Sequence, residues 1–293
     1  MKRKNPVRLM VFWSVFLSLA ALICVTNLHT LWNYAFWANI PADMVEKDVF
    51  RDMDFPRDGL EKIEQLAKKT GLQFAETAAI VMTRYDFSPS TWELEGTKRE
   101  DVWDWNHILE GTDETKYKPI EEAYQAILSD IQYFPVPDSL NKERKPVTFS
   151  DTWKQKRTYG GERLHEGTDI MGDAYERGTY PIVSMTDGYV ENMGWLEKGG
   201  WRIGIRGASG GYFYYAHLYA FASGLKEGDF VKAGQLLGYM GDSGYGKEEG
   251  TVGKFPVHLH FGIYLETEHM EEMSVNPYPI LVYAQKYKLN YDY

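Results

Sequence analysis

The chain has 293 residues, a formal net charge of −10 at pH 7 and a single cysteine, Cys24. That length suffices for one large domain or two ordinary ones with appendages. The acidic balance, with Lys and Arg scattered along the chain, argues against a nucleic-acid partner, which needs a basic face. One cysteine excludes a disulfide within the chain and a cysteine-rich zinc site, so a metal would need His and carboxylate ligands.

The N-terminal residues have the pattern of a membrane anchor. Residues 1–8 include the basic residues Lys2, Arg3, Lys4 and Arg8, and residues 9–28 carry no charged side chain. About twenty apolar residues match the hydrocarbon thickness that one helix crosses, and basic residues on the N-terminal side keep that end in the cytoplasm. We predict a cytoplasmic tail at residues 1–8, a single-pass transmembrane signal anchor at residues 9–30 and an extracytoplasmic remainder. A cleaved signal peptide is the alternative, but the apolar run is longer than its usual core.

Residues 41–133 have the texture of a small all-α region. Apolar residues recur at helical spacing in residues 58–69, 74–82 and 119–131, and Gly71 follows the first of these segments as a C-terminal capping glycine would. His107 is the only histidine of the region, so the sequence offers no metal-ligand cluster there. We expect a spacer that carries the rest of the chain away from the membrane, or a docking site for an envelope protein.

The texture changes after a linker predicted at residues 134–146, where two prolines lie two residues apart. From residue 147 to residue 285, short β-branched and aromatic runs alternate with glycines, which is typical of an antiparallel all-β domain. The expected strands are residues 180–185, 188–195, 201–205, 212–218, 230–239 and 257–265.

The last of these strands carries the pair His258 and His260. Side chains at positions i and i+2 of a strand leave the same face, so both imidazoles point to one side, while Leu259 and Phe261 point to the other. Two imidazoles on one face suit a metal or proton-transfer site set on a sheet.

Two other stretches extend this site. His165 and Asp169 lie four residues apart across Gly167, and the glycine permits a sharp turn that brings both side chains to one point. With one histidine of the pair they form a His₂Asp set whose fourth position stays open, as in catalytic zinc sites. His217, in an aromatic strand, can serve there as a proton shuttle.

These motifs, in this order, resemble the lysostaphin or LytM-type peptidoglycan metalloendopeptidases, peptidase family M23. The resemblance rests on His-x-x-x-Asp, then a Tyr-x-His-Leu strand, then His-Leu-His-Phe-Gly, and covers residues 147–266. It implies a compact antiparallel β-fold with the site in a groove and one zinc ion held by His165, Asp169 and His260. His217 and His258 match the family's two non-ligand histidines, which move protons and stabilise the transition state.

The resemblance also implies the substrate, peptide bonds in the stems or cross-bridges of bacterial peptidoglycan. Together with the predicted anchor, this gives an expected location at the bacterial cell membrane. One departure is the loop at residues 245–255, which is longer than in the family and bears on substrate preference. Two other functions stay open: a catalytically silent scaffold that binds an envelope partner or glycan, and a zinc peptidase that acts on proteins. Because the chain is acidic, we expect local groove contacts to dominate binding to an anionic wall polymer.

Overall fold

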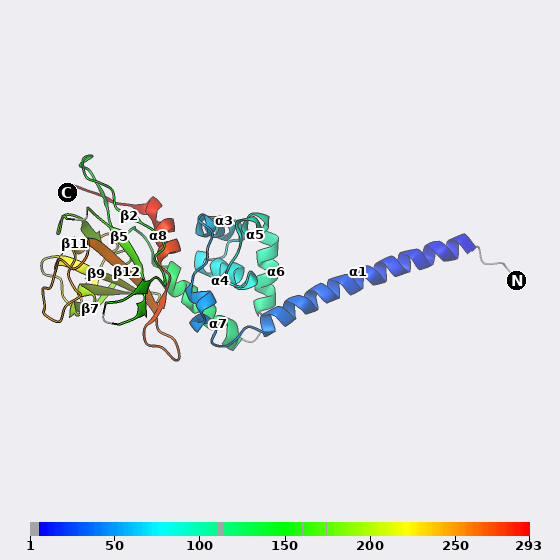
Figure 1. Cartoon of the computed structure of the whole chain (residues 1–293). Helices are drawn as coiled ribbons and strands as arrows, with labels where there is room; N and C mark the ends of the chain where they lie inside the picture. Colours follow the sequence, from blue (N-terminus) through cyan, green and yellow to red (C-terminus); the bar gives the residue numbers. More distant parts are fainter. Residues whose placement is uncertain (1–5, 111–113, 160, 174) are drawn as a thin grey trace.

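A computed structural model describes residues 6–110, 114–159, 161–173 and 175–293. Helices fill the N-terminal half, and strands follow from residue 138 onward (Figure 1). The helices are α1 (Pro6–Ala38), η1 (Met44–Glu46), α2 (Asp48–Arg51), α3 (Gly59–Thr70), α4 (Phe74–Arg84), α5 (Thr91–Gly96), α6 (Arg99–Glu110), α7 (Glu114–Leu128), α8 (Tyr278–Ala284) and η2 (Gln285–Tyr287).

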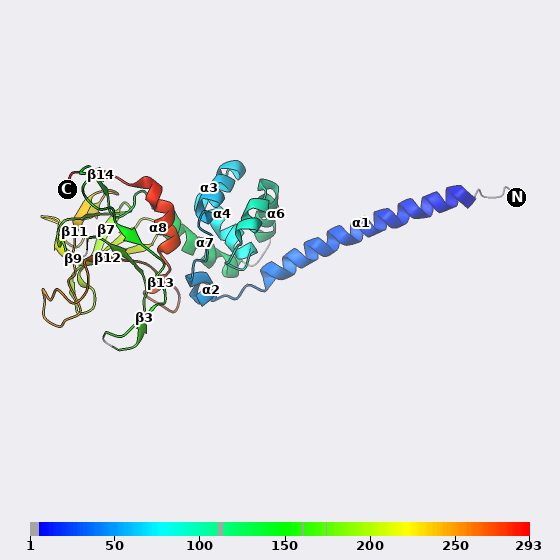
Figure 2. The same cartoon turned by 45° about the horizontal axis from the view of Figure 1, so that its top comes forward.

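Helix α1 projects away from the folded remainder in both views (Figures 1 and 2). The transmembrane anchor predicted at residues 9–30 falls within it, whereas most of the predicted basic tail, residues 1–5, lies outside the described residues. None of the helices in the described part of the chain combines the length and the apolar character needed to cross a membrane. The anchor therefore stays a prediction.

The helices predicted within residues 41–133 are confirmed. Helix α3 buries Leu60, Ile63 and Leu66 on one face and ends at Gly71, whose φ of +81° is the left-handed conformation that glycine adopts without a steric cost. Helix α4 begins with a capping box, and α7 begins before the predicted start at Pro119. Helices α2, α5 and α6 were not expected, because each buries too few side chains to give a clear apolar period.

The strands confirm the predicted antiparallel all-β domain. In the described part of the chain, the main sheet has ten strands in the order β10-β7-β8-β9-β12-β5-β2, with β11, β6 and β13 paired beside this path. Its strand pairs are antiparallel. The strands of this sheet are β2 (Thr148–Phe149), β5 (Thr168–Met171), β6 (Pro181–Val183), β7 (Gly188–Leu196), β8 (Gly200–Gly207), β9 (Tyr212–Phe221), β10 (Phe230–Val231), β11 (Leu236–Met240), β12 (His258–Leu265) and β13 (Met273–Val275).

Two small pairs complete the β-structure. Strands β3 (Lys156–Arg157) and β4 (Arg163–Leu164) form a hairpin beside the main sheet. Strand β1 (Asp138–Ser139), which lies in the predicted linker, pairs in parallel with β14 (Asn290–Tyr291) near the C-terminus. The segment at residues 134–146 is thus tied to the β-domain by backbone hydrogen bonds.

The two faces of strand β12 divide the sheet into a core side and an open side. Leu259, Phe261 and Ile263 are fully buried in the apolar core, as the alternation predicts. His258 and His260 point to the other side. In register across the sheet, His260 lies opposite Asp169 of β5 and Ala216 of β9, so these strands bring one row of residues together.

The helical region lies beside the β-domain (Figure 2). Buried apolar residues of both belong to one continuous core. Arg51 of α2 donates from Nε to the carbonyl of Ser274 at 3.0 Å and accepts from the backbone N–H of Asn276 at 2.8 Å. Just after α2, the carboxylate of Asp52 accepts a hydrogen bond from the indole N–H of Trp153 at 2.8 Å. These contacts hold the helices against the edge of the sheet that carries the histidines.

Candidate metal centre

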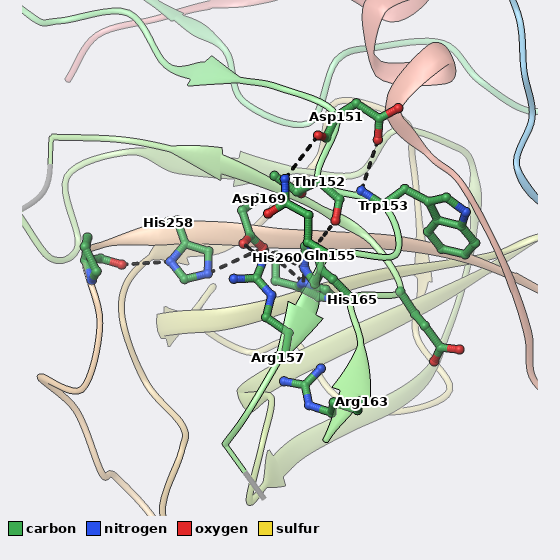
Figure 3. A network of polar contacts seen from close by, with 12 residues as sticks. Asp151, Thr152, Trp153, Gln155, Arg157, Arg163, His165, Asp169, His258 and His260 are labelled. Carbon is green, nitrogen blue, oxygen red and sulfur yellow. Dashed lines mark hydrogen bonds and ion pairs between the residues drawn. The ribbon is translucent and has the colours of Figure 1, made fainter. Parts of the chain in front are cut away.

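Three side chains from separate parts of the β-domain meet at one point. His165 lies in the loop between β4 and β5, Asp169 on β5 and His260 on β12. The Oδ1 atom of Asp169 lies 3.1 Å from Nε2 of His165 and 3.1 Å from Nδ1 of His260, and the two imidazole nitrogens are 2.9 Å apart. Figure 3 shows the three groups converging. The structure thus brings together the three predicted metal ligands.

Backbone carbonyls set the orientation of three of the four histidines. Nδ1 of His165 bonds the carbonyl of Thr152 at 3.0 Å, Nδ1 of His258 that of Pro256 at 2.7 Å, and Nδ1 of His217 that of Ser243 at 2.8 Å. Because a carbonyl only accepts, each Nδ1 carries the proton, and each neutral ring keeps Nε2 as an acceptor. Three Nε2 lone pairs are therefore available for a metal ion or a proton.

Arg157 is a partner of the cluster that the sequence did not reveal. Its guanidinium lies 2.6 Å from Oδ2 of Asp169 (Figure 3). This contact engages one carboxylate oxygen and leaves the other, Oδ1, facing the two histidines. A group that binds the far oxygen of a ligating carboxylate fixes its orientation.

The two predicted non-ligand histidines lie beside the cluster. Nε2 of His258 is 3.6 Å from Oδ1 of Asp169, and the rings of His258 and His217 have their centroids 4.8 Å apart. His217 has a φ of +63° where the pairing of β9 with β8 shifts register. This left-handed backbone is uncommon for a residue other than glycine and is typical of constrained functional positions.

Burial favours the neutral form of His260 and His217, and the contacts around Asp169 favour its ionised form. Burial lowers the pKa of His260 to about 4 and holds the pKa of His217 well below its usual value. Burial alone would raise the pKa of Asp169, but the contacts of its carboxylate with the imidazoles of His165 and His260 outweigh burial, and the pKa falls well below its usual range. Neutral imidazoles and an ionised carboxylate are the forms that ligate metals.

Position 167 must be glycine because there is no room for a side chain between this loop and strand β12. A Cβ atom there would lie 2.6 Å from the His260 ring and from the carbonyl oxygen of Phe261. The glycine was expected to provide a sharp turn, but its φ is not in the left-handed region. Its contribution is to let the loop that carries His165 approach strand β12 closely.

The cluster opens into a groove of about 480 Å³. The loop at residues 245–255 forms part of the wall, since the ring of Phe255 lies 4.5 Å from that of His217 and Tyr245 stacks on Tyr159 at 4.3 Å. The loop that departs from the family pattern thus borders the site. The groove is lined by Arg157, Arg163, His165, Glu166, Asp169, Asn192, Leu196, Lys198, Gly199, Arg202, Tyr212, Tyr214, His217, Tyr245, Phe255, His258, His260, Tyr264 and Glu272.

The donor set fits zinc. His165, Asp169 and His260 each offer one ligand atom, and these atoms all lie within 4.8 Å of one another. Two imidazole nitrogens and one carboxylate oxygen match the ligands of catalytic zinc sites, in which the fourth position is left for water or substrate. The residues present therefore fit the metal that the sequence predicts.

Comparison with known proteins places these residues in a family. Residues 163–277 match the model of peptidase family M23. The L-Ala–D-Glu endopeptidase of Bacillus subtilis is 41% identical over 174 residues, which is 59% of this chain and 50% of that protein. Lysostaphin of Staphylococcus simulans is 33% identical over 100 residues, 33% of this chain and 17% of that protein. The chain thus spans about half the length of the first of these relatives, and less of the second.

A solved structure shares most of the architecture. A Ruminococcus gnavus protein, provisionally named glycyl-glycine endopeptidase lytM, superimposes with a TM-score of 0.73 at 42% sequence identity, over 85% of this chain and 95% of that one. An overlap of that extent reaches beyond the β-domain into the helical region, to which the sequence resemblance did not extend. Since almost the whole of that relative is matched, the chain belongs to peptidase family M23.

Proposed function

We propose that this protein is a zinc metalloendopeptidase that hydrolyses peptide bonds in the stem peptides or cross-links of peptidoglycan. The observation that carries this proposal is the convergence of His165, Asp169 and His260 in an open groove, with His217 and His258 beside them. His and carboxylate ligands account for a metal, and the adjacent imidazoles account for proton transfer. This combination is what metal-assisted hydrolysis of an amide needs.

In the proposed mechanism, three side chains bind the metal, and the two imidazoles that are not ligands transfer protons and donate hydrogen bonds. A zinc ion held by the three ligands would lower the pKa of a water molecule and polarise the scissile carbonyl. His258 or His217 accepts the proton of the attacking water at Nε2 and returns it to the leaving amine. The other imidazole donates a hydrogen bond to the oxygen of the carbonyl as negative charge develops there.

The relatives support a substrate in the cell wall. One is named for cleavage of an L-Ala–D-Glu bond, which is a stem-peptide linkage, and another, from Staphylococcus capitis, is named glycyl-glycine endopeptidase ALE-1. The higher identity to the first, 41% against 35%, over a longer stretch favours a stem-peptide bond in this protein.

We also propose that the protein works outside the cytoplasm, held at the cell membrane by its N-terminal segment. Along α1, large apolar side chains are exposed from Met10 to Leu28, as they would be in contact with lipid. Cell fractionation and protease accessibility of intact cells test this location. Recovery of the full-length chain in the soluble cytoplasmic fraction would contradict it.

The first test of function is zinc content together with release of soluble peptide from purified peptidoglycan. The full chain should hold about one zinc ion and cut, whereas His260→Ala should lose both properties because a ligand is missing. His269→Ala is the matched control, since that histidine is exposed and pairs with Glu46 far from the centre. A chain that holds zinc but releases nothing from peptidoglycan would favour a silent scaffold, and one that instead cuts a protein substrate would favour a protein peptidase.

A further inference from the structure

One arginine in the groove takes no part in the proposed mechanism. Arg202, on β8, lines the groove, and its Nη1 atom is buried without a hydrogen-bond partner. Among the described residues, it takes part in no salt bridge or side-chain hydrogen bond that would neutralise it. A buried N–H of a charged group without a partner costs stability, so its retention calls for an acceptor that arrives with a ligand.

Arg206, four residues further along the same strand, is an arginine whose hydrogen bonds are satisfied by the fold itself. Its Nε and Nη2 atoms bind both carboxylate oxygens of Glu191 at 2.6 and 2.7 Å, and Nη1 donates to the carbonyl of Gly210 at 2.9 Å. Both side chains leave the same face of β8, because they are four residues apart on a strand. The protein thus supplies a bidentate carboxylate to one arginine and none to the other.

The strand register puts Arg202 in line with the metal centre. The flanking residues of Arg202 pair with Tyr215 and Leu218 of β9, so it lies opposite the bulge formed by Ala216 and His217. Ala216 in turn pairs with His260. Two strand spacings of ~4.8 Å separate Arg202 from His260, or about 10 Å along the floor of the groove. An extended peptide covers that distance in about three residues.

The surroundings of Arg202 suit a carboxylate. Burial raises the pKa of Tyr214, which also lines the groove, and the positive charge of Arg202 acts against that shift. Of the other arginines in the groove, Arg157 binds Asp169, and Arg163 donates to the Tyr245 hydroxyl at 3.0 Å. Arg202 is therefore the arginine left free for a ligand, in a chain whose net charge is −10.

We propose that Arg202 recognises a free carboxylate of the peptide substrate, about one to three residues from the scissile bond, and so selects acidic stem peptides over neutral bridges. This inference rests on the proposed function and refines its substrate class. A glycine bridge carries no side-chain carboxylate. A peptide that contains D-Glu keeps one carboxyl group free when the other continues the chain, and a guanidinium binds such a group through two parallel hydrogen bonds.

The test uses two synthetic peptides that contain L-Ala followed by D-Glu and differ only in whether the free carboxylate is converted to a carboxamide. Binding of each peptide is measured by calorimetry on the full chain after zinc removal, and cleavage is measured on the zinc-loaded chain. We expect wild type to bind the free acid about tenfold or more tightly than the amide, as for a charged hydrogen-bonded pair. Arg202→Gln should bring the two affinities within about twofold, and Arg202→Lys should give an intermediate ratio.

Arg206→Gln is the matched control and should keep the wild-type preference. Equal binding of the two peptides by wild type, or a preference unchanged in Arg202→Gln, would overturn the inference. Cleavage of both peptides at equal rates would leave the enzyme proposal standing and remove this one. A chain that cuts neither peptide, but whose binding preference depends on Arg202, would support the recognition site and contradict the proposed reaction.

Discussion

The helical region and the β-domain bury polar side chains in different ways. In the helical region, as far as the structure describes it, Thr77 and Thr83 are buried within α4 and Thr97 is buried at the end of α5. Each hydroxyl donates to the carbonyl four residues earlier, at 2.9, 2.7 and 2.8 Å. A threonine bonded in this way is satisfied within its own helix and has no remaining donor. These groups are consistent with a region built for packing.

The β-domain instead buries histidines whose second ring nitrogen points toward the groove and its other ionisable groups. His165, His217 and His258 are 2%, 5% and 8% exposed, and each uses Nδ1 on a backbone carbonyl while Nε2 faces the groove. Nε2 of His165 lies 3.1 Å and Nε2 of His258 lies 3.6 Å from Oδ1 of the same carboxylate, Asp169. Gathering several buried ionisable side chains at one point is unfavourable, so folding alone does not account for this cluster. The difference teaches that a cluster of ionisable side chains around a groove, more than burial itself, marks the functional region.

The largest effect that would sharpen this contrast is expected at His217. The variant His217→Asn suits the test, because asparagine tolerates the left-handed backbone that this position adopts, whereas alanine would add strain. It should keep its zinc and lose about 10²–10⁴-fold in peptide release, the range typical of a proton-transfer group. Zinc content and turnover are measured on the same sample. Loss of zinc would make His217 a ligand, and unchanged turnover would remove it from the mechanism.

The complementary change is in the helical core. Ile63 of α3 is fully buried, so Ile63→Ala should lower the free energy of unfolding by about 2–5 kcal/mol. Zinc affinity of the folded fraction should stay the same, because no ligand lies in the helices. Val49→Ala, at a position 41% exposed in α2, is the control and should change stability little. Chemical denaturation and zinc titration together separate the two properties. A weakened zinc site in Ile63→Ala would show that the regions are coupled.

A smaller effect is expected at Arg157, which binds the far oxygen of Asp169. Arg157→Ala should weaken zinc binding about 10–100-fold, as for other groups that orient a metal ligand. Competition with a chelator of known affinity measures the change, and Lys156→Ala, at the exposed neighbouring position, is the control. Tighter binding in Arg157→Ala would mean that the positive charge of the arginine opposes the cation more than its hydrogen bond supports the carboxylate.

The contrast between Arg157 and the histidines also shows which site residues can be predicted from the sequence and which cannot. His258 and His260 could be placed on one face because the side-chain period of a strand is two, and His165 and Asp169 because a short loop keeps them close. Arg157 reaches Asp169 only through the β3–β4 hairpin, and its local sequence carries no pattern that predicts this contact. Arg202 and Arg206 have similar apolar neighbours in sequence, but Arg206 binds the carboxylate of Glu191 whereas Arg202 binds none in the described part of the chain. Such differences depend on which strands become neighbours.

The fold shows the same limit. Strong alternation predicted β7, β8, β9 and β12, but the single strand expected at residues 230–239 is divided into β10 and β11. Gly234 between them has a φ of +81°, which a strand does not allow. Helix α8 was missed because its seven residues lie inside a segment predicted to be all β, where its apolar residues suit either structure.

The smallest predicted effect is at a helix cap that is distant from the groove. Ser90 caps α5: its hydroxyl accepts from the backbone N–H of Glu93 at 3.2 Å, and the Glu93 carboxylate accepts from the backbone N–H of Ser90 at 2.8 Å. Ser90→Ala should lower the free energy of unfolding by about 1 kcal/mol, since one helix N–H loses its partner. Ser90→Asp restores an acceptor and should recover most of that loss in thermal or chemical denaturation. Zinc content and peptide release should be unchanged in both variants, because every polar group that the cap uses is satisfied within the helical region. A change in either property would contradict the division between a packing region and a catalytic one.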